Sequence, residues 1–173
     1  MSPPRLGLVG IGFMGRGMAK NLISPKKAFK YQSLGIFDSN PSNEAVKSLR
    51  DQAKELGVPM TVASSTHQLA KDSDIVCLSL PSEQSCNDVV DTLLAGFNAE
   101  KKLSPILYSW DIPPNTPIIV DHGTFSREFS LKTAEKAKHH GVKYVDGECY
   151  WFSSVWVTVV GILVGMSQET GCD

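Results

Sequence analysis

Three glycines near the start of the chain have the spacing of a turn that binds phosphate. Gly10, Gly12 and Gly15 stand in the order G-x-G-x-x-G, directly after the apolar segment 6–9. In this pattern the first glycine permits a tight turn, the second lets an anion approach the backbone, and the third lets a helix pack closely. The free N–H groups at the start of that helix, together with its dipole, attract negative charge. The pattern therefore predicts a site for the pyrophosphate of a dinucleotide.

A carboxylate stands where the other half of such a site needs one. Asp38 ends the apolar segment 34–37, about 20 residues beyond the last glycine, as the dinucleotide fingerprint expects. A carboxylate there can accept hydrogen bonds from both ribose hydroxyls of the adenosine half, and it repels a 2′-phosphate. No arginine stands beside it, so NAD is the favoured cofactor and NADP the alternative. A turn or N-cap role is the purely structural interpretation of Asp38.

Both features lie in a chain that alternates between strand-like and helical segments. Strands are expected in the apolar segments 6–9, 34–37, 60–62, 75–80, 117–121 and 142–145. Helices are expected between them, at 13–22, 42–56, 66–71, 82–94 and from Thr124 or Ser126 to His140. This alternation indicates a Rossmann-type α/β fold, with a doubly wound, mostly parallel sheet in a single domain. Ligands of such sheets bind at the carboxyl edge, where Pro81 and Thr124 follow the fourth and fifth strands.

The composition excludes several other classes of function. The net charge is −1 with both signs mixed along the chain, so no basic surface is expected to attract nucleic acid. The four cysteines form no C-x-x-C pair and are expected to be reduced thiols, and no metal site is expected. Because the first apolar strand begins at Leu6, no signal or transit peptide is expected, and the predicted location is the cytoplasm rather than the mitochondrion.

An uncharged stretch at 149–166 is the least typical part of the sequence. Its length reaches the lower limit for a membrane-spanning helix. Its many β-branched residues and its two glycines favour strands instead, with a membrane helix or an unstructured tail as the alternatives. A membrane partner is therefore not expected, whereas an exposed apolar surface of this kind would promote self-association.

Taken in order, these motifs resemble the nucleotide-binding domain of the β-hydroxyacid dehydrogenases, which include 3-hydroxyisobutyrate dehydrogenase and 6-phosphogluconate dehydrogenase. The resemblance extends from Leu6 to Gly165 and rests on the run GLVGIGFMGRGMAKNL, on Leu80-Pro81, on 121–124, on Val145-Asp146 and on ILVG at 162–165. It implies a dinucleotide-binding domain at 1–166 and a short tail at 167–173, with the helical catalytic domain absent. The cofactor contacts that it implies are Gly10, Ile11, Gly12, Phe13, Met14, Gly15, Asp38, Leu80, Pro81 and Thr124.

The resemblance also implies a reaction, the reversible transfer of hydride between the nicotinamide and a small β-hydroxyacid, with a lysine as general acid and base. Three departures from the family bear on that activity. Gly123 stands where the family has a serine near the substrate, and residues 146–152 lack the family's Ser-Gly-Gly. No lysine follows Lys143, so the catalytic lysine of the family has no counterpart and no catalytic residue is assigned.

We therefore expect a chain that binds a dinucleotide but turns over slowly or not at all, with a small hydroxyacid as substrate only of a full-length form. Two alternatives stay open. One is a non-catalytic NAD(P)-binding module that senses the dinucleotide or pairs with another chain. The other is an NADP-dependent relative of 6-phosphogluconate dehydrogenase that acts on a sugar phosphate.

Overall fold

The computed structural model of the chain describes residues 3–24, 31–40, 42–97 and 116–147. The strands predicted within 149–166 lie outside these residues, as does most of the segment between the fourth helix and the fifth strand. Within the described part of the chain, no helix is both long enough and apolar enough to cross a membrane.

Six parallel strands form one sheet in the order β3-β2-β1-β4-β5-β6. The strands are β1 Arg5–Val9, β2 Ser33–Phe37, β3 Met60–Val62, β4 Ile75–Leu78, β5 Ile118–Asp121 and β6 Lys143–Asp146. The helices are α1 Phe13–Ile23, α2 Glu44–Glu55, α3 Thr66–Asp72, α4 Glu83–Gly96 and α5 Arg127–His139. The predicted doubly wound α/β fold is confirmed, and every strand pair of the described sheet is parallel.

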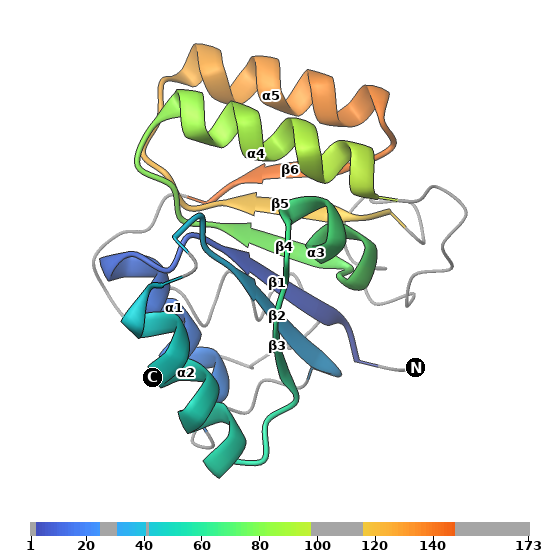
Figure 1. Cartoon of the computed structure of the whole chain (residues 1–173). Helices are drawn as coiled ribbons and strands as arrows, with labels where there is room; N and C mark the ends of the chain where they lie inside the picture. Colours follow the sequence, from blue (N-terminus) through green and yellow to red (C-terminus); the bar gives the residue numbers. More distant parts are fainter. Residues whose placement is uncertain (1–2, 25–30, 41, 98–115, 148–173) are drawn as a thin grey trace, which may run out of the picture.

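Helices cover both faces of the sheet, with α1 and α2 on one face and α3, α4 and α5 on the other (Figure 1). The alternation of side chains along β4 illustrates why. Ile75 and Cys77 join the apolar cluster of α1 and α2, whereas Val76 and Leu78 join the cluster of the other three helices. All four side chains are buried. A strand that is covered on both faces in this way reads as a continuous apolar run.

Helix starts are set by side chains that accept hydrogen bonds from free backbone N–H groups. The second helix begins later than predicted, because Asn43 caps it by accepting from the backbone N of Ala45 at 2.9 Å. Of the two candidates for the start of α5, the cap is Ser126, whose hydroxyl accepts from the backbone N of Phe129 at 3.2 Å. An oxygen at the N-cap replaces a hydrogen bond that the first turn cannot make internally.

The strand order places a crevice at the carboxyl end of the central strands. From β1 the chain proceeds outward to β2 and β3, and it then returns to β4 on the other side of β1. The loops after β1 and β4 therefore leave the sheet in opposite directions, which opens a space between them. Ligands of open α/β sheets bind at such a switch point.

Candidate functional site

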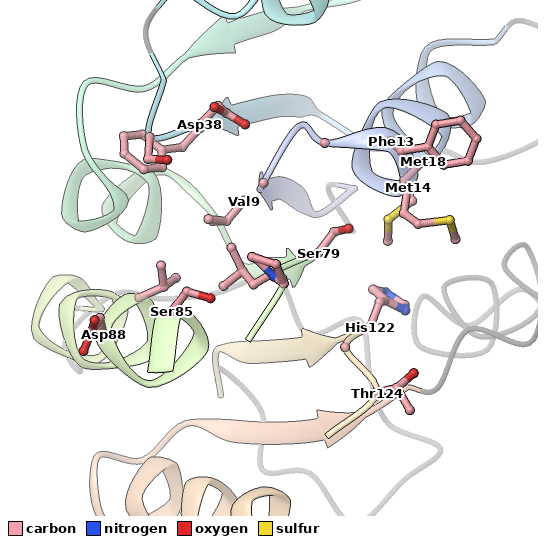
Figure 2. A pocket seen from close by; sticks show the side chains of 18 residues that line it. Val9, Phe13, Met14, Met18, Asp38, Ser79, Ser85, Asp88, His122 and Thr124 are labelled. Carbon is pink, nitrogen blue, oxygen red and sulfur yellow. The ribbon is translucent and has the colours of Figure 1, made fainter. Parts of the chain in front are cut away.

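A cavity of about 660 Å³ opens at this switch point, along the carboxyl ends of β1, β2, β4 and β5 (Figure 2). Its volume lies within the range of small-molecule and cofactor sites. Most of the residues predicted to contact a cofactor line it, namely Gly10, Gly12, Phe13, Met14, Asp38, Leu80, Pro81 and Thr124. The two predicted residues that do not line it are Ile11 and Gly15.

Two glycines of the motif are required by the packing of the protein itself. Gly10 has a φ of +87°, and a Cβ atom there would overlap the backbone carbonyl of Ser79. A Cβ atom on Gly15 would overlap the carbonyl oxygen of Gly10. These two residues therefore shape the turn and bring α1 close to the end of β1, as the spacing predicts.

Packing within the protein does not require a glycine at the middle position, Gly12. Gly12 has a φ of −72°, which any residue adopts, and a Cβ atom there would meet no atom within 4 Å. Gly12 is also the N-cap of α1 and lines the cavity, and no side chain caps this helix. A bare backbone at a helix N-terminus, with open space in front of it, fits a bound anion. The backbone at the start of α1 therefore fits a bound pyrophosphate.

Asp38 connects the loop after β2 to the glycine turn. Its Oδ2 accepts from the backbone N of Ile11 at 2.7 Å, and its Oδ1 accepts from the backbone N of Asn40 at 2.9 Å. The side chain of Asn43 donates to the carbonyl of Ile11 at 3.2 Å. The side chain of Ile11 is buried, and only its backbone atoms take part in these hydrogen bonds. Asp38 therefore has the structural role of a turn residue and also lines the cavity.

These two hydrogen bonds leave the carboxylate of Asp38 able to bind a ligand. Each carboxylate oxygen has two lone-pair sites, and one of them on each oxygen is used by a backbone N–H. The remaining sites can accept from neighbouring hydroxyls, such as those of a ribose. The two interpretations of Asp38, as a turn residue and as a hydroxyl acceptor, are thus compatible.

A buried carboxylate holds the turn after β5. The Oδ1 of Asp121 accepts from the backbone N of Gly123 at 2.9 Å. Its Oδ2 accepts from the Cys86 thiol at 2.9 Å and from the Tyr144 hydroxyl at 2.6 Å. Burial, reinforced by the hydrogen bond to Asp121, raises the pKa of both Cys86 and Tyr144 well above their ordinary values. Both groups therefore remain neutral donors to the carboxylate.

His122 and Thr124 follow Asp121 and line the cavity. The Nδ1 atom of His122 donates to the carbonyl of Gly147 at 3.0 Å. Burial lowers the pKa of His122, so its ring is neutral at physiological pH. At the intervening Gly123, a Cβ atom would overlap the ring of Phe125. The serine that the family has at this position would therefore require Phe125 to move.

Several residues of the cavity wall were not predicted from the sequence. His122 and Ser79 follow β5 and β4, and Ser85, Asp88 and Val89 lie on the first turns of α4. In the view of Figure 2, Asp38, Ser85 and Asp88 lie at one end of the cavity, and Phe13, Met14, Met18, His122 and Thr124 lie at the other. One end is thus rich in carboxylates, whereas the other carries the exposed Phe13 and Met14 side chains.

Comparison with known proteins agrees with this geometry. Residues 5–147 match the family model described as the NAD-binding domain of 6-phosphogluconate dehydrogenase. A comparison with curated protein sequences finds no match. Among solved structures, the 3-hydroxyisobutyrate dehydrogenase of Mycobacterium tuberculosis, solved with L-serine, is similar with a TM-score of 0.65 and 17% identity over 96% of this chain and 52% of that one.

Two further structures come from Myxococcus stipitatus. Its imine reductase with NADP⁺ is similar with a TM-score of 0.61 and 15% identity, over 94% of this chain and 53% of that chain. The V8 variant of that enzyme with NAD⁺ is similar with a TM-score of 0.62 and 16% identity, over 96% of this chain and 53% of that chain. The present chain thus spans about half the length of these structures. At these identities the likeness shows the fold, whereas the family model covers most of the chain, which therefore belongs to the family of NAD-binding domains of 6-phosphogluconate dehydrogenase.

Proposed function

We propose that the cavity binds a nicotinamide adenine dinucleotide as the cofactor half of an oxidoreductase. The observation that carries this proposal is Gly12, whose missing side chain serves no packing contact and leaves open space at the start of α1. The first-turn backbone N–H groups of α1 would bind the pyrophosphate, and Asp38 would accept from the hydroxyls of the adenosine ribose. The membership of the NAD-binding family supports the same assignment.

NAD is proposed as the preferred form of the cofactor. Asp38 would lie where a 2′-phosphate adds negative charge in NADP, and like charges repel at short range. Within the described residues, the second carboxylate of the cavity wall, Asp88, lies at the same end (Figure 2). Solved structures of similar fold hold either NADP⁺ or NAD⁺, so the preference must come from these side chains rather than from the fold.

The proposed reaction is hydride transfer between the nicotinamide and a small β-hydroxyacid. The bound dinucleotide would supply the hydride acceptor or donor. Thr124 and His122 would lie beside the nicotinamide end, and the apolar Phe13 and Met14 would help to exclude water from it. The resemblance of the sequence motifs to the β-hydroxyacid dehydrogenases supports this substrate class, and a 3-hydroxyisobutyrate dehydrogenase shares the fold. Because the chain spans about half of that structure, the proposal concerns the protein in its full-length form.

A second candidate function is a non-catalytic module that binds NAD(H). It is favoured by Gly123, because the family serine is missing and the ring of Phe125 fills the space in front of that position. Such a module would keep the pyrophosphate and ribose contacts, which do not involve Gly123. An NADP-dependent enzyme acting on a sugar phosphate is the remaining alternative, and Asp38 argues against it.

Isothermal titration of the purified chain with NADH and with NADPH tests the proposal. We expect submillimolar binding of NADH and weaker binding of NADPH. If neither dinucleotide binds below millimolar concentration, the proposed function is wrong. Incubation of the full-length form with NAD⁺ and a panel of small β-hydroxyacids then separates the two candidates, because formation of NADH at an ordinary enzymatic rate would exclude the non-catalytic module and its absence would exclude the dehydrogenase.

A further inference from the structure

The end of the cavity that lies between the loop after β2 and helix α4 is lined by apolar side chains. Phe37 and Val89 line the cavity there, and both are half-buried against the core of the α4 face. Phe37 comes from the end of β2, and Val89 comes from the second turn of α4, beyond the Cys86 that contacts the β5 turn. A planar aromatic ligand suits such a slot, because its faces bury apolar surface while its edge remains open to polar contacts.

The polar edge of this slot is formed by α4. Asp88 lies directly before Val89 and lines the same cavity, together with Ser85 one turn earlier. The Oδ1 atom of Asp88 accepts from the side-chain Nε2 of Gln84 at 2.8 Å, which fixes the carboxylate on the helix surface. Within the described part of the chain, no donor is recorded for its Oδ2 atom. Asp88 therefore presents an acceptor, and no donor, to whatever occupies the slot.

Asp38 and Asp88 would face different parts of an adenosine bound in the cavity. Asp38 belongs to the glycine turn through its hydrogen bond with Ile11, so it would lie beside the sugar next to a bound pyrophosphate. Asp88 lies further along α4, in Figure 2 farther from Val9 and the glycine turn than Ser85 is. A base attached to that sugar would reach toward α4. Its outer edge would then meet Asp88.

We infer that Asp88 reads the base of the dinucleotide, by accepting a hydrogen bond from the exocyclic 6-amino group of adenine in the slot between Phe37 and Val89. This inference rests on the proposed function, since it assumes that a dinucleotide binds in the cavity. It adds a selection for adenine over bases that have a carbonyl oxygen at position 6. A carboxylate attracts an amino group and repels a carbonyl oxygen.

Nicotinamide hypoxanthine dinucleotide is the probe for this inference, because it differs from NADH in the base and keeps the pyrophosphate and both riboses. Titration calorimetry of the chain with the reduced forms of both dinucleotides should give NADH the lower Kd, by about tenfold. In the Asp88→Asn variant the ratio should fall to about one. The reason is that the asparagine amide can donate to the carbonyl oxygen of hypoxanthine.

Asp72→Asn is the matched control. Asp72 is an exposed helical aspartate that accepts from Gln68 Nε2 at 2.7 Å, the same spacing and bond as the Gln84–Asp88 pair, and it lies outside the cavity. This variant should keep the wild-type ratio, and both variants should melt at the wild-type temperature. A wild-type ratio of one or less, or an unchanged ratio in Asp88→Asn, would overturn the inference while leaving the proposed function intact. If neither dinucleotide binds the wild-type chain, the proposed function fails and the inference fails with it.

Discussion

The carboxylate of Asp38 is hydrogen-bonded to the backbone of Ile11 across 2.7 Å, so the loop after β2 and the glycine turn form one unit. The Asn43 side chain closes the same unit by donating to the carbonyl of Ile11. Two contacts that a dinucleotide would use, at Gly12 and at Asp38, are therefore held at a fixed separation before any ligand binds. Such preorganisation lowers the entropy that binding must overcome.

Replacement of Asp38 by asparagine should change the preference between the two cofactors. The variant removes the negative charge, so NADPH binding should improve relative to NADH by about tenfold. The asparagine oxygen can still accept from one backbone N–H, so the fold should remain and the free energy of unfolding should fall by only about 1 kcal/mol. Titration calorimetry with both cofactors measures the ratio.

Asp51→Asn provides the control for that experiment, since Asp51 is an exposed aspartate on α2 outside the cavity. It removes the same charge without touching the site, and it should leave the ratio of the two affinities unchanged. An identical ratio in Asp38→Asn and in the wild-type chain would mean that Asp38 does not face the ribose.

The Asp121 network predicts that stability falls at alkaline pH. The pKa values of Cys86 and Tyr144 are raised in the folded chain, whereas in the unfolded chain they return to about 9.0 and 10.0. Above the unfolded pKa of each group, the unfolded chain releases a proton that the folded chain retains. The stabilisation is thus complete below pH 9 and is lost as the pH rises further, by up to about 1.4 kcal/mol per pH unit for each group.

Urea unfolding between about pH 8 and about pH 10.5 measures this slope. The Cys86→Ala variant is less stable at every pH but should show a shallower fall, because one of the two titrating groups is gone. Tyr144→Phe should keep the onset near pH 9 and show a shallower fall above pH 10, whereas Cys86→Ala should delay the onset to about pH 10. If the slope in both variants equals that of the wild-type chain, the network does not control the alkaline limit.

Much of the fold follows from local sequence, and the candidate site follows only in part. The buried strand β4 and the cap residues Ser82 and Ser126 are visible in apolar runs and in polar residues that precede them. The places of Asp88 and Ser85 in the cavity wall could not be predicted from the sequence, because polar residues on an amphipathic helix normally face solvent. Only the strand order brings this part of α4 to the loop after β2, and no local pattern contains that information.

The hydrogen bonds of Asp121 could not be predicted either, because they also depend on the order of the strands. Cys86, Tyr144 and Gly123 come from α4, β6 and the turn after β5, and their contacts with Asp121 depend on three long-range pairings. The departure at Gly123, in contrast, was visible as a missing serine. What the structure adds is its partner, because Phe125 fills the space that a side chain would need.

Gly123→Ser should therefore destabilise the chain unless Phe125 is made smaller. The new Cβ atom would overlap the ring of Phe125, which must then rotate out of its edge-on contact with Phe129, and the loss of such a contact costs about 1 kcal/mol. In the Phe125→Ala background the same glycine-to-serine change should cost clearly less. A double-mutant cycle of urea unfolding free energies measures this coupling. Additive costs would show that the two positions do not compete for space.

The central claim, that a dinucleotide pyrophosphate lies against the backbone of Gly12, is tested most directly by a pair of glycine-to-alanine variants. Gly12 and Gly17 are both exposed positions of α1 or its cap, and an added Cβ meets no protein atom at either one. Only Gly12 lines the cavity. Titration calorimetry with NADH should show at least about tenfold weaker binding for Gly12→Ala and wild-type binding for Gly17→Ala. Equal affinities of the two variants for NADH would contradict the account.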